Sequence, residues 1–436
     1  MPPQVQTRAM QPVYGGNFRS DNAGPLSFVL PGELVAATAN PAESSRILEP
    51  SPDRVTPRCA HFGACGGCQY QHADYAAQVA LKSQILEGIL RAHGLAALPG
   101  IPTRHAAPWE YRNRIRVRLE PASSGGAARL DIGYSRRSSN EFLPIRMCPI
   151  AAPLLLRAAE RLLRIAEAEP ACRRWLDSVA EVELFSNGEE SRLQMQFFLR
   201  EPVADDAGFS ALCERLRTAI PELAGAGAEL DPALNRRVRR RWNGIAWGAP
   251  GLNYEVADRT YWVSRRAFFQ VNRFLIETLV HLVCKGQKGG LAWDLFAGVG
   301  LFSRVLAERF ERVIAVEAGD AAAADLVVAG KGGKGKPAFE ALHSSTLDFL
   351  RAQGLQRERP ELIVLDPPRA GLGAEAAQVL ARIGAPQLVY VSCDPTTLAR
   401  DLAILTRGGY RIDTIDLIDL FPQTFHIETV VRLSRG

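Results

Sequence analysis

Four short apolar runs in the second half of the chain constrain its fold more than any other feature. Each ends at a polar or special residue, and helical stretches separate most of them; the runs are LAWDLF, RVIAVE, ELIVLD and QLVYVS. Strands and helices that alternate in this way are typical of a doubly wound parallel sheet. Such sheets bind ligands at the carboxyl ends of their strands. Asp294, Glu317, Asp366 and Cys393 all fall there, so we predict an α/β domain with its site at that edge.

The chain as a whole divides into four predicted segments. Residues 1–57 are rich in Pro, Gly, Ser and Ala and contain one strand-like run, so we expect a short, incomplete β unit. Residues 58–100 hold a bunch of cysteines followed by an amphipathic helical pattern. Residues 101–261 mix strand and helix signals, which predicts a central α+β domain. The doubly wound domain then takes residues 262–436.

Composition narrows the class of protein. Of the 436 residues, 47% are apolar and 23% are charged, as in ordinary soluble domains. The N-terminus has no apolar core of the signal-peptide type, and no run of about 18 apolar residues occurs. We therefore expect a cytoplasmic protein with reduced thiols and no membrane association. The net charge of +5 is compatible with a polyanionic partner without requiring one.

The first apolar run leads into a glycine-containing turn. In WDLFAGVGLFS, Asp294 ends a strand and is followed by Gly298 and Gly300. Glycine is needed where the backbone turns sharply or approaches a ligand closely. Glu317 ends the next strand, where a carboxylate suits a bidentate hydrogen bond to ribose hydroxyls. These features predict a nucleoside-containing cofactor. The alternative is a glycine turn beside a solvated acid, and a nicotinamide cofactor is disfavoured because the third glycine of its fingerprint is missing.

A rigid turn and a lone cysteine follow the other two runs. In LIVLDPPRAGLG, two prolines stiffen the backbone after Asp366, so that its carboxylate can be held against a planar base; a rigid turn with a capping acid is the alternative. Cys393 stands ahead of a helix, whose N-terminus is expected to lower the pKa of the thiol. Taken alone, a cysteine at a strand end is more often a packed residue than a nucleophile.

The segment FPQTFHIETV, near the C-terminus, adds Glu428 just before an apolar strand, with His426 two residues earlier. A thiolate, a carboxylate and a methyl-donor pocket together suit methylation of the C5 carbon of uracil. That carbon is a weak nucleophile until a thiolate adds at C6, and a general base must afterwards remove the C5 proton. We therefore predict that Cys393 adds to C6, that Glu428 removes the proton, and that Asp366 helps to hold the base.

A cluster of cysteines indicates a metal site. Cys59, Cys65 and Cys68 have the spacing C-x5-C-x2-C, and RMCPI offers Cys148 as a distant fourth ligand. Four thiolates can hold either tetrahedral zinc or a 4Fe-4S cluster, and the spacing does not choose between them. It does not match the C-x3-C-x2-C motif of radical S-adenosylmethionine enzymes.

Two basic stretches are candidate RNA contacts. In YRNRIRVRL, the residues Arg112, Arg114, Arg116 and Arg118 alternate with apolar ones, which on a strand gives one basic and one apolar face. NRRVRRRWNG adds a second basic run with Trp242. Guanidinium groups pair with phosphates, and aromatic rings stack on unpaired bases. Two solvated basic faces are the alternative reading.

Taken in order, the motifs resemble those of the RNA uracil-C5 methyltransferase family, and specifically its iron–sulfur branch, which modifies large-subunit (23S) ribosomal RNA. The resemblance runs from about residue 50 to the C-terminus and rests on SPDRVTPRCAHFGACGGCQYQH, YRNRIRVRL, FFQVN, DLFAGVGLFS, DPPRAGL, YVSCDPTTLARDL and FPQTFHIETV. It implies a Rossmann-like S-adenosylmethionine methyltransferase domain. In the larger members a small RNA-binding β-barrel comes first, and residues 1–57 resemble only part of it.

The resemblance also implies roles for individual residues. Cys393 would be the nucleophile and Glu428 the base. The S-adenosylmethionine pocket would be lined by Gln270, Phe296, Gly298, Gly300, Leu301, Glu317 and Asp366. The resemblance also favours a 4Fe-4S cluster over zinc as the group bound by Cys59, Cys65, Cys68 and Cys148. The expected partner is ribosomal RNA, and the expected oligomeric state is a monomer.

Three other functions compete with this interpretation. A transfer-RNA uridine methyltransferase normally lacks the cysteine cluster. An amino-methyltransferase acting on adenine would need an aromatic residue after DPP, where Arg369 stands. A metal-stabilised RNA-binding protein without activity would leave Cys393 and Glu428 unexplained.

Overall fold

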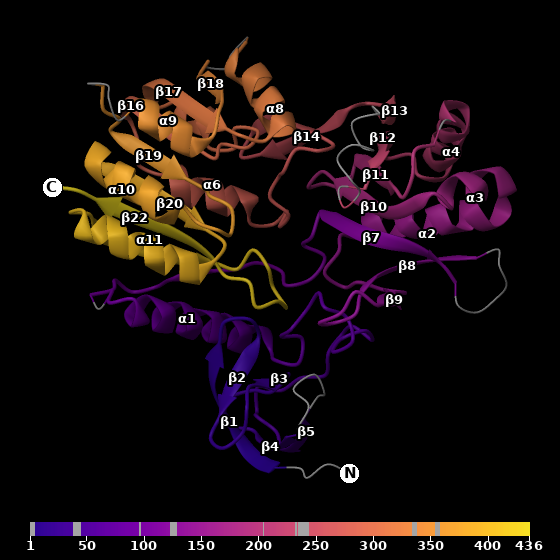
Figure 1. The fold of residues 1–436 in the computed structure, drawn as a ribbon, viewed down its shortest axis with the longest axis horizontal. Coiled ribbons are helices and arrows are strands. Elements are labelled where there is room, and N and C mark those ends of the chain that lie inside the picture. The colour runs from indigo at the N-terminus through magenta and orange to yellow at the C-terminus, as the bar shows by residue number, and fades with distance from the viewer. Residues whose placement is uncertain are drawn as a thin grey trace.

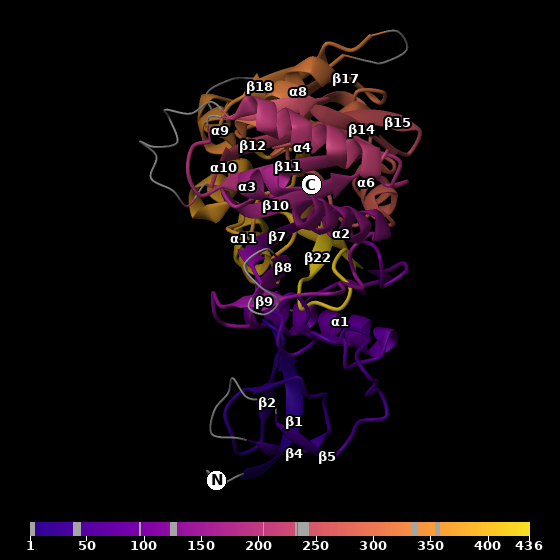
Figure 2. The same ribbon diagram turned by 90° about the vertical axis from the view of Figure 1, so that its right-hand side faces the viewer.

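The computed structural model describes residues 5–37, 45–95, 97–122, 129–203, 205–231, 233, 244–333, 338–353 and 358–436. Figure 1 shows a sheet-and-helix unit from the C-terminal half, a second such unit from the middle of the chain, and a small N-terminal sheet below them, with α1 between. The view turned by 90° again places the small sheet at one end of the molecule (Figure 2). Within the described residues, no helix has both the length and the apolar character needed to span a bilayer.

The C-terminal unit is built on an eight-stranded sheet. The strands, in spatial order, are β18 (Glu340–His343), β17 (Phe310–Glu317), β16 (Gly289–Leu295), β19 (Leu362–Leu365), β20 (Gln387–Ser392), β22 (Glu428–Ser434), β21 (Arg411–Ile418) and β6 (Thr103–Arg104). The first five are parallel to one another, whereas β22 pairs antiparallel with both β20 and β21. The four strands expected from the apolar runs are confirmed as β16, β17, β19 and β20 and are neighbours in the sheet.

Both faces of this sheet are buried, as its apolar strands require. On β16, Leu291 and Trp293 belong to one core and Ala292 to the core on the opposite face. The helices of this unit are α6 (Ile276–Cys284), α7 (Ser303–Leu306), α8 (Asp320–Gly330), α9 (Thr346–Gln353), α10 (Gly373–Ile383) and α11 (Pro395–Arg407). Since successive residues of a strand point to opposite faces, one run of apolar residues can fill two cores.

Two segments from before residue 262 belong to this unit as well. The hairpin of β14 (Gly251–Val256) and β15 (Arg259–Ser264) buries Leu252, Tyr254 and Val263 in one of its cores. Strand β6 pairs with β21 at the edge of the sheet. The proposed boundary between residues 261 and 262 therefore falls inside β15, and the division into domains stays a prediction.

Within the described residues, the central unit is a seven-stranded sheet with three helices. Its spatial order is β13 (Ile245–Gly248), β12 (Leu223–Leu230), β11 (Leu193–Leu199), β10 (Val179–Ser186), β7 (Arg114–Pro121), β8 (Leu130–Ser135) and β9 (Phe142–Pro144). The pairs are antiparallel except β11 with β12. The helices α2 (Pro153–Ala168), α3 (Pro170–Leu176) and α4 (Asp206–Ala219) share one core with the sheet. This part of the chain therefore mixes strands and helices, while its bounds as a domain stay a prediction.

The N-terminal residues form a five-stranded sheet in the order β3 (Leu26–Ser27), β2 (Asn17–Ser20), β1 (Val5–Val13), β4 (Leu34–Ala37) and β5 (Arg46–Glu49). Phe18, Val29 and Val35 form its core together with Tyr70 and Leu81, which lie outside the unit. Leu81 belongs to helix α1 (Tyr75–Ala92), which Asp74 caps by accepting a hydrogen bond from the Ala77 amide. The core of this sheet is therefore completed by residues that follow it in the sequence, from the cysteine segment and helix α1.

Candidate active site

The carboxyl ends of four adjacent parallel strands bring the predicted residues to one edge. Glu317 ends β17, Phe296 follows β16, Asp366 follows β19 and Cys393 follows β20. The strands lie in the order β17, β16, β19, β20, so these residues occur in that order along the edge. Asp294, the fourth residue predicted at this edge, is the next-to-last residue of β16, so all four lie at the carboxyl ends of neighbouring strands.

The glycine turn after β16 is fixed by the acid of the next strand. Glu317 accepts hydrogen bonds from the amide of Gly298 at 2.8 Å and from the amide of Gly319 at 2.6 Å. Gly298 and Gly300 have φ of +56° and +89°, and Phe296 has φ of +63°. A Cβ on Gly300 would lie 3.0 Å from Leu326, whereas one on Gly298 would meet nothing within 4 Å. The turn therefore passes beside open space at Gly298, where the cofactor is predicted.

Two further carboxyl groups belong to this edge of the sheet: Asp294 is buried, whereas Asp366 is partly exposed. Burial raises the pKa of Asp294 to about 7 despite hydrogen bonding to Ser303, and the charge of Glu317 adds to the effect. Burial also raises the pKa of Asp366 to about 7, with contributions from Asp294 and Glu317. Gln270 donates a hydrogen bond to Asp366 at 3.4 Å. Of the remaining predicted pocket residues, Leu301 is buried, and its carbonyl accepts a hydrogen bond from Tyr261 at 3.0 Å.

Cys393 and Glu428 lie opposite each other across two antiparallel strands. Strands β20 and β22 pair in a register that sets Ser392 against Thr429, and the next residues along the two strands are Cys393 and Glu428. The Glu428 side chain is buried, whereas Cys393 is partly exposed. The structure therefore places the predicted nucleophile at a surface that a substrate can reach, with the predicted base behind it.

The expectation that the helix N-terminus lowers the pKa of Cys393 is wrong. Burial raises that pKa to about 12, and the carboxyl groups of Glu428 and Asp366 raise it further, while Arg369 opposes them. The first amides of α11 are also already engaged, because Asp394 accepts hydrogen bonds from Thr396 and Thr397. Burial beside acids outweighs the helix terminus at this position.

Arg369 and His426 border the same region. Burial and the charge of Arg369 lower the pKa of His426 to about 4, so the ring is neutral at pH 7. The guanidinium of Arg369 lies 3.2 Å from Nε2 of His426. Burial raises the pKa of Glu428 well above its usual range, the charge of Asp366 raises it too, and Arg369 opposes both. Arg369 is thus a cation that counteracts the acids of this site. The sequence motifs did not indicate this role.

The loop that leads to Glu428 is fixed by helix α1 from a distant part of the sequence. Lys82 Nζ lies 2.6 Å from Oδ1 of Asp419 and donates to the Phe421 carbonyl at 2.9 Å. Gln78 donates to the Gln423 side chain at 3.0 Å and accepts from the Gln423 amide at 3.0 Å. Both side chains of the Lys82–Asp419 pair are fully buried. No local pattern in the sequence could have indicated these contacts.

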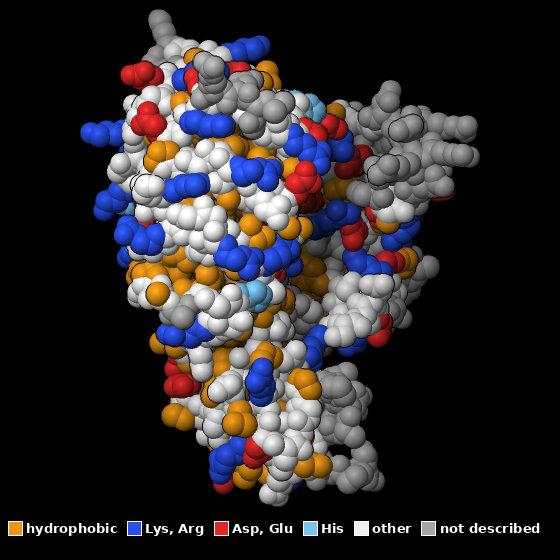
Figure 3. All heavy atoms as spheres, turned by 60° about the vertical axis from the view of Figure 1, so that its left-hand side comes forward, with side chains coloured by type: hydrophobic (Ala, Val, Ile, Leu, Met, Phe, Trp, Pro, Cys, Tyr) orange, Lys and Arg blue, Asp and Glu red, His pale blue; other side chains and the backbone are white. Residues whose placement is uncertain are grey.

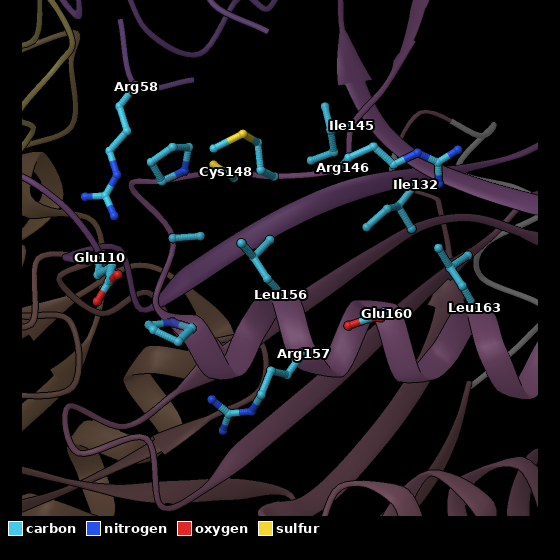
Figure 4. Close-up of a pocket in the computed structure, with 14 residues that line it drawn as sticks. Arg58, Glu110, Ile132, Ile145, Arg146, Cys148, Leu156, Arg157, Glu160 and Leu163 are labelled. Carbon is cyan, nitrogen blue, oxygen red and sulfur yellow. The ribbon is translucent and has the colours of Figure 1, made fainter. Parts of the chain in front are cut away.

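The four predicted metal ligands line one cavity of about 340 Å³. Burial raises the pKa of Cys68 to about 12 and also raises those of Cys65 and Cys148. Among the described residues, however, no three His, Cys, Asp or Glu side chains converge into a ready-made metal site. A second cavity, of about 500 Å³, lies between the segment of Cys148 and helix α2 (Figure 4). The structure thus brings the four cysteines together without showing what they bind.

The arginines of β7 lie on one strand face, as predicted, while Ile115, Val117 and Leu119 are buried on the other. Each of the three strand arginines already has a partner within the protein. Arg116 pairs with Glu181 and lies over Phe198, and Arg114 is 3.8 Å from Glu183. The third, Arg118, pairs with Glu120. Arg112, which precedes the strand, donates to the carbonyl of Arg114. Their role in RNA binding stays a prediction.

Basic side chains are spread over the face shown in Figure 3 among apolar and acidic ones, with no single basic patch. The other predicted RNA contact, Trp242, lies outside the described residues.

Three comparisons with known proteins bear on this site. Residues 338–436 match the family model described as tRNA (Uracil-5-)-methyltransferase. The 23S rRNA (uracil(1939)-C(5))-methyltransferase RlmD of an Azoarcus species is 32% identical, covering 93% of each chain. An RNA methyltransferase of Streptomyces coelicolor, described as uncharacterized, is 32% identical over 97% of this chain and 90% of its own.

Among solved structures, the tRNA (uracil-54, C5)-methyltransferase of Pyrococcus abyssi in complex with S-adenosyl-L-homocysteine superposes with a TM-score of 0.74. It covers 98% of this chain and 100% of its own at 21% identity, and so supports the fold alone. The relatives at 32% identity extend over almost the whole chain and carry the assignment. The protein belongs to the RNA uracil-C5 methyltransferase family.

Proposed function

We propose that the protein methylates the C5 carbon of a specific uridine in 23S ribosomal RNA, using S-adenosylmethionine. The observation that carries this proposal is the pairing of Cys393 with Glu428 across β20 and β22, next to Asp366. A nucleophile, a base and a carboxyl group that can hold a uracil ring thus meet at one edge of the sheet. The 23S relatives at about the same length support the choice of ribosomal RNA. The expectations of a cytoplasmic monomer are kept as part of the proposal.

The chemistry assigns one bond change to each group. The thiol of Cys393 first gives up its proton to water, a loss that the charge of Arg369 favours. The resulting thiolate bonds to C6, and the electron pair of the C5–C6 double bond moves into the ring as an enolate. The C5 carbon then takes the methyl group from the sulfonium, whose sulfur keeps the bonding electrons. Glu428 removes the C5 proton, the C5–C6 double bond reforms, and the thiolate leaves. Burial raises the pKa of Glu428, so its carboxylate, once ionised, is a stronger base than an exposed one, and the charge of Arg369 favours the ionised form.

The remaining residues bind and orient the uracil ring and the cofactor. Asp366 is fixed by Gln270, and its raised pKa lets a protonated carboxyl group donate to a ring carbonyl. Glu317 would accept from the ribose hydroxyls of the cofactor, because its carboxylate stands beside the turn at Gly298. S-adenosylmethionine would supply the methyl group and, through its sulfonium, a positive charge among these acids.

A substitution pair tests the mechanism. Cys393→Ala should abolish both methylation and any covalent RNA adduct, since no other group can add to C6. Glu428→Gln should lower turnover by about 10²- to 10⁴-fold while the adduct accumulates, because the proton can no longer be removed. Adducts are seen as a shifted band on a denaturing gel with labelled RNA. Methylation by the Cys393→Ala variant would overturn the proposal.

The four cysteines fit a group that takes four thiolate ligands, since all of them line one cavity. Both zinc and a 4Fe-4S cluster take such a set, and we propose the 4Fe-4S cluster, with a structural or RNA-positioning role. Protein purified without oxygen should then be brown, and Cys148→Ser should lose iron, measured by elemental analysis. Colourless protein that carries one zinc would contradict the cluster.

The target RNA is open to a direct test that separates the two RNA classes. Mass spectrometry of ribosomal and transfer RNA from a deletion strain should show one methyluridine missing from 23S ribosomal RNA. Loss from transfer RNA instead would favour the alternative enzyme, whose family model covers residues 338–436.

A further inference from the structure

The turn between β1 and β2 reaches from the N-terminal sheet to the region of Cys393. Tyr14, in this turn, packs against the core that contains Tyr390 and Leu398, on either side of the nucleophile in the sequence. Burial raises the pKa of the Tyr14 phenol, and the charges of Asp394 and Cys393 raise it further. A residue of the N-terminal unit is therefore a neighbour of the predicted nucleophile.

The turn is held there by close packing. A Cβ on Gly16, whose φ is +83°, would lie 2.9 Å from the Gln69 side chain and 3.7 Å from Cβ of Phe425. Gln69 in turn accepts a hydrogen bond from the Phe425 amide at 3.4 Å. The turn thus docks on the cysteine segment and on the loop that precedes Glu428, so its position near the site is fixed on two sides.

Tyr14 is one of a series of rings in this region. Its centroid lies 5.4 Å from that of Phe425 in an edge-on contact, and Phe425 lies 4.3 Å from His426. An edge-on contact covers at most one face of one ring, so ring faces stay open. Tyr14, Phe425, His426 and Cys393 are all partly exposed. An accessible aromatic surface therefore borders the thiol.

We propose that Tyr14, together with Phe425 and His426, forms a stacking surface for an unpaired RNA base next to the target uracil, which makes Tyr14 a specificity-determining residue. This inference rests on the proposed function. A uracil in folded RNA must be splayed out to reach Cys393, and its neighbours lose their own stacking partners when that happens. Aromatic side chains replace such stacking, at about 1–3 kcal/mol per base.

The test uses an RNA fragment around the methylated uridine, carrying 2-aminopurine on either side of it. Stacking quenches 2-aminopurine fluorescence, so the full-length protein with S-adenosylhomocysteine should quench the signal on one side. Tyr14→Ala should remove the quenching and weaken RNA binding by about 5- to 100-fold. Tyr14→Phe, which keeps the ring, should behave like the unsubstituted protein. Met10→Ala, an exposed change on β1, is the matched control.

The outcomes separate the two proposals. If the unsubstituted protein methylates no RNA, the proposed function fails. If it methylates RNA but Tyr14→Ala quenches and binds as before, only the stacking surface fails. Should Tyr14→Ala lower the unfolding temperature, Tyr14→Leu replaces it, because leucine keeps apolar bulk without a flat ring. S-adenosylhomocysteine binding measured by calorimetry should be unchanged in every variant, and its loss would indicate a structural role and overturn the inference.

Discussion

At the scale of single residues, the site brings together acids that are buried or partly buried. Asp294, Asp366 and Glu428 are each shifted toward the protonated form, with burial as the largest cause. These carboxyl groups and Cys393 could be found from the sequence, because each lies where a locally recognisable strand ends or, for Glu428, begins. It misjudged the pKa of Cys393, since burial and the charge of Glu428 depend on contacts with a strand far along the chain.

Asp294 should make folding stability depend on pH. Its pKa rises from 3.8 in the unfolded chain to about 7 in the folded one, so the folded state binds more protons between those values, and stability falls as pH rises from about 4 to 7. At about 1.36 kcal/mol per pKa unit, the part of that fall that lies above pH 5 is about 3 kcal/mol, and Asp294→Asn should remove it. Denaturant unfolding at pH 5 and pH 8 measures it.

The unfolding free energy of Asp294→Asn is compared with that of the unsubstituted protein at each pH, because Asp366 titrates in the same range in both proteins. The asparagine variant should gain stability relative to the unsubstituted protein as pH rises. A difference in unfolding free energy that stays constant from pH 5 to pH 8 would show that Asp294 is charged in the folded protein even at the lower pH.

At the scale of elements, helix α1 and the loop before β22 act as one structure. The helical pattern of α1 was readable from its apolar spacing, but its buried Lys82 and Gln78 look like ordinary surface residues in the sequence. Their partners are Asp419 and Gln423, more than three hundred positions away. Only the folded chain shows that this helix fixes the loop that carries Glu428.

Lys82→Met should therefore be strongly destabilising. It leaves the Asp419 carboxylate buried with the Tyr75 hydroxyl at 2.9 Å as its remaining side-chain partner, and loss of one member of a buried pair costs about 3–5 kcal/mol. Denaturant unfolding gives the value. Arg91→Ala on the same helix breaks an exposed pair with Glu87 and should cost less than about 1 kcal/mol. Equal losses in the two variants would contradict the assigned role of Lys82.

At the scale of the whole molecule, the units are less separate than the sequence predicts. The order of strands and helices and the approximate extent of each unit followed from local patterns. The shared cores could not be predicted from local patterns. The β14–β15 hairpin, which begins before residue 262, and helix α1 both pack against the C-terminal sheet. The sheet's edge strand, β6, likewise comes from residues 103–104.

Residues 262–436 expressed alone should not fold cooperatively. Without the hairpin and α1, the fragment exposes core that Leu252, Tyr254 and Leu86 otherwise cover, and exposed apolar area favours aggregation. Circular dichroism during heating compares it with the full chain. A cooperative transition near that of the full chain would show that the C-terminal unit is independent.

Strand β22 has a consequence for the order in which the sheet assembles. It lies between β20 and β21 and begins with Glu428, so β21 and β6 join the five parallel strands only through it. Until β22 has paired with β20, Glu428 is not set beside Cys393. A folding intermediate that lacks this one pairing therefore presents the proposed nucleophile without the proposed base, and insertion of β22 becomes the folding step that completes the pair.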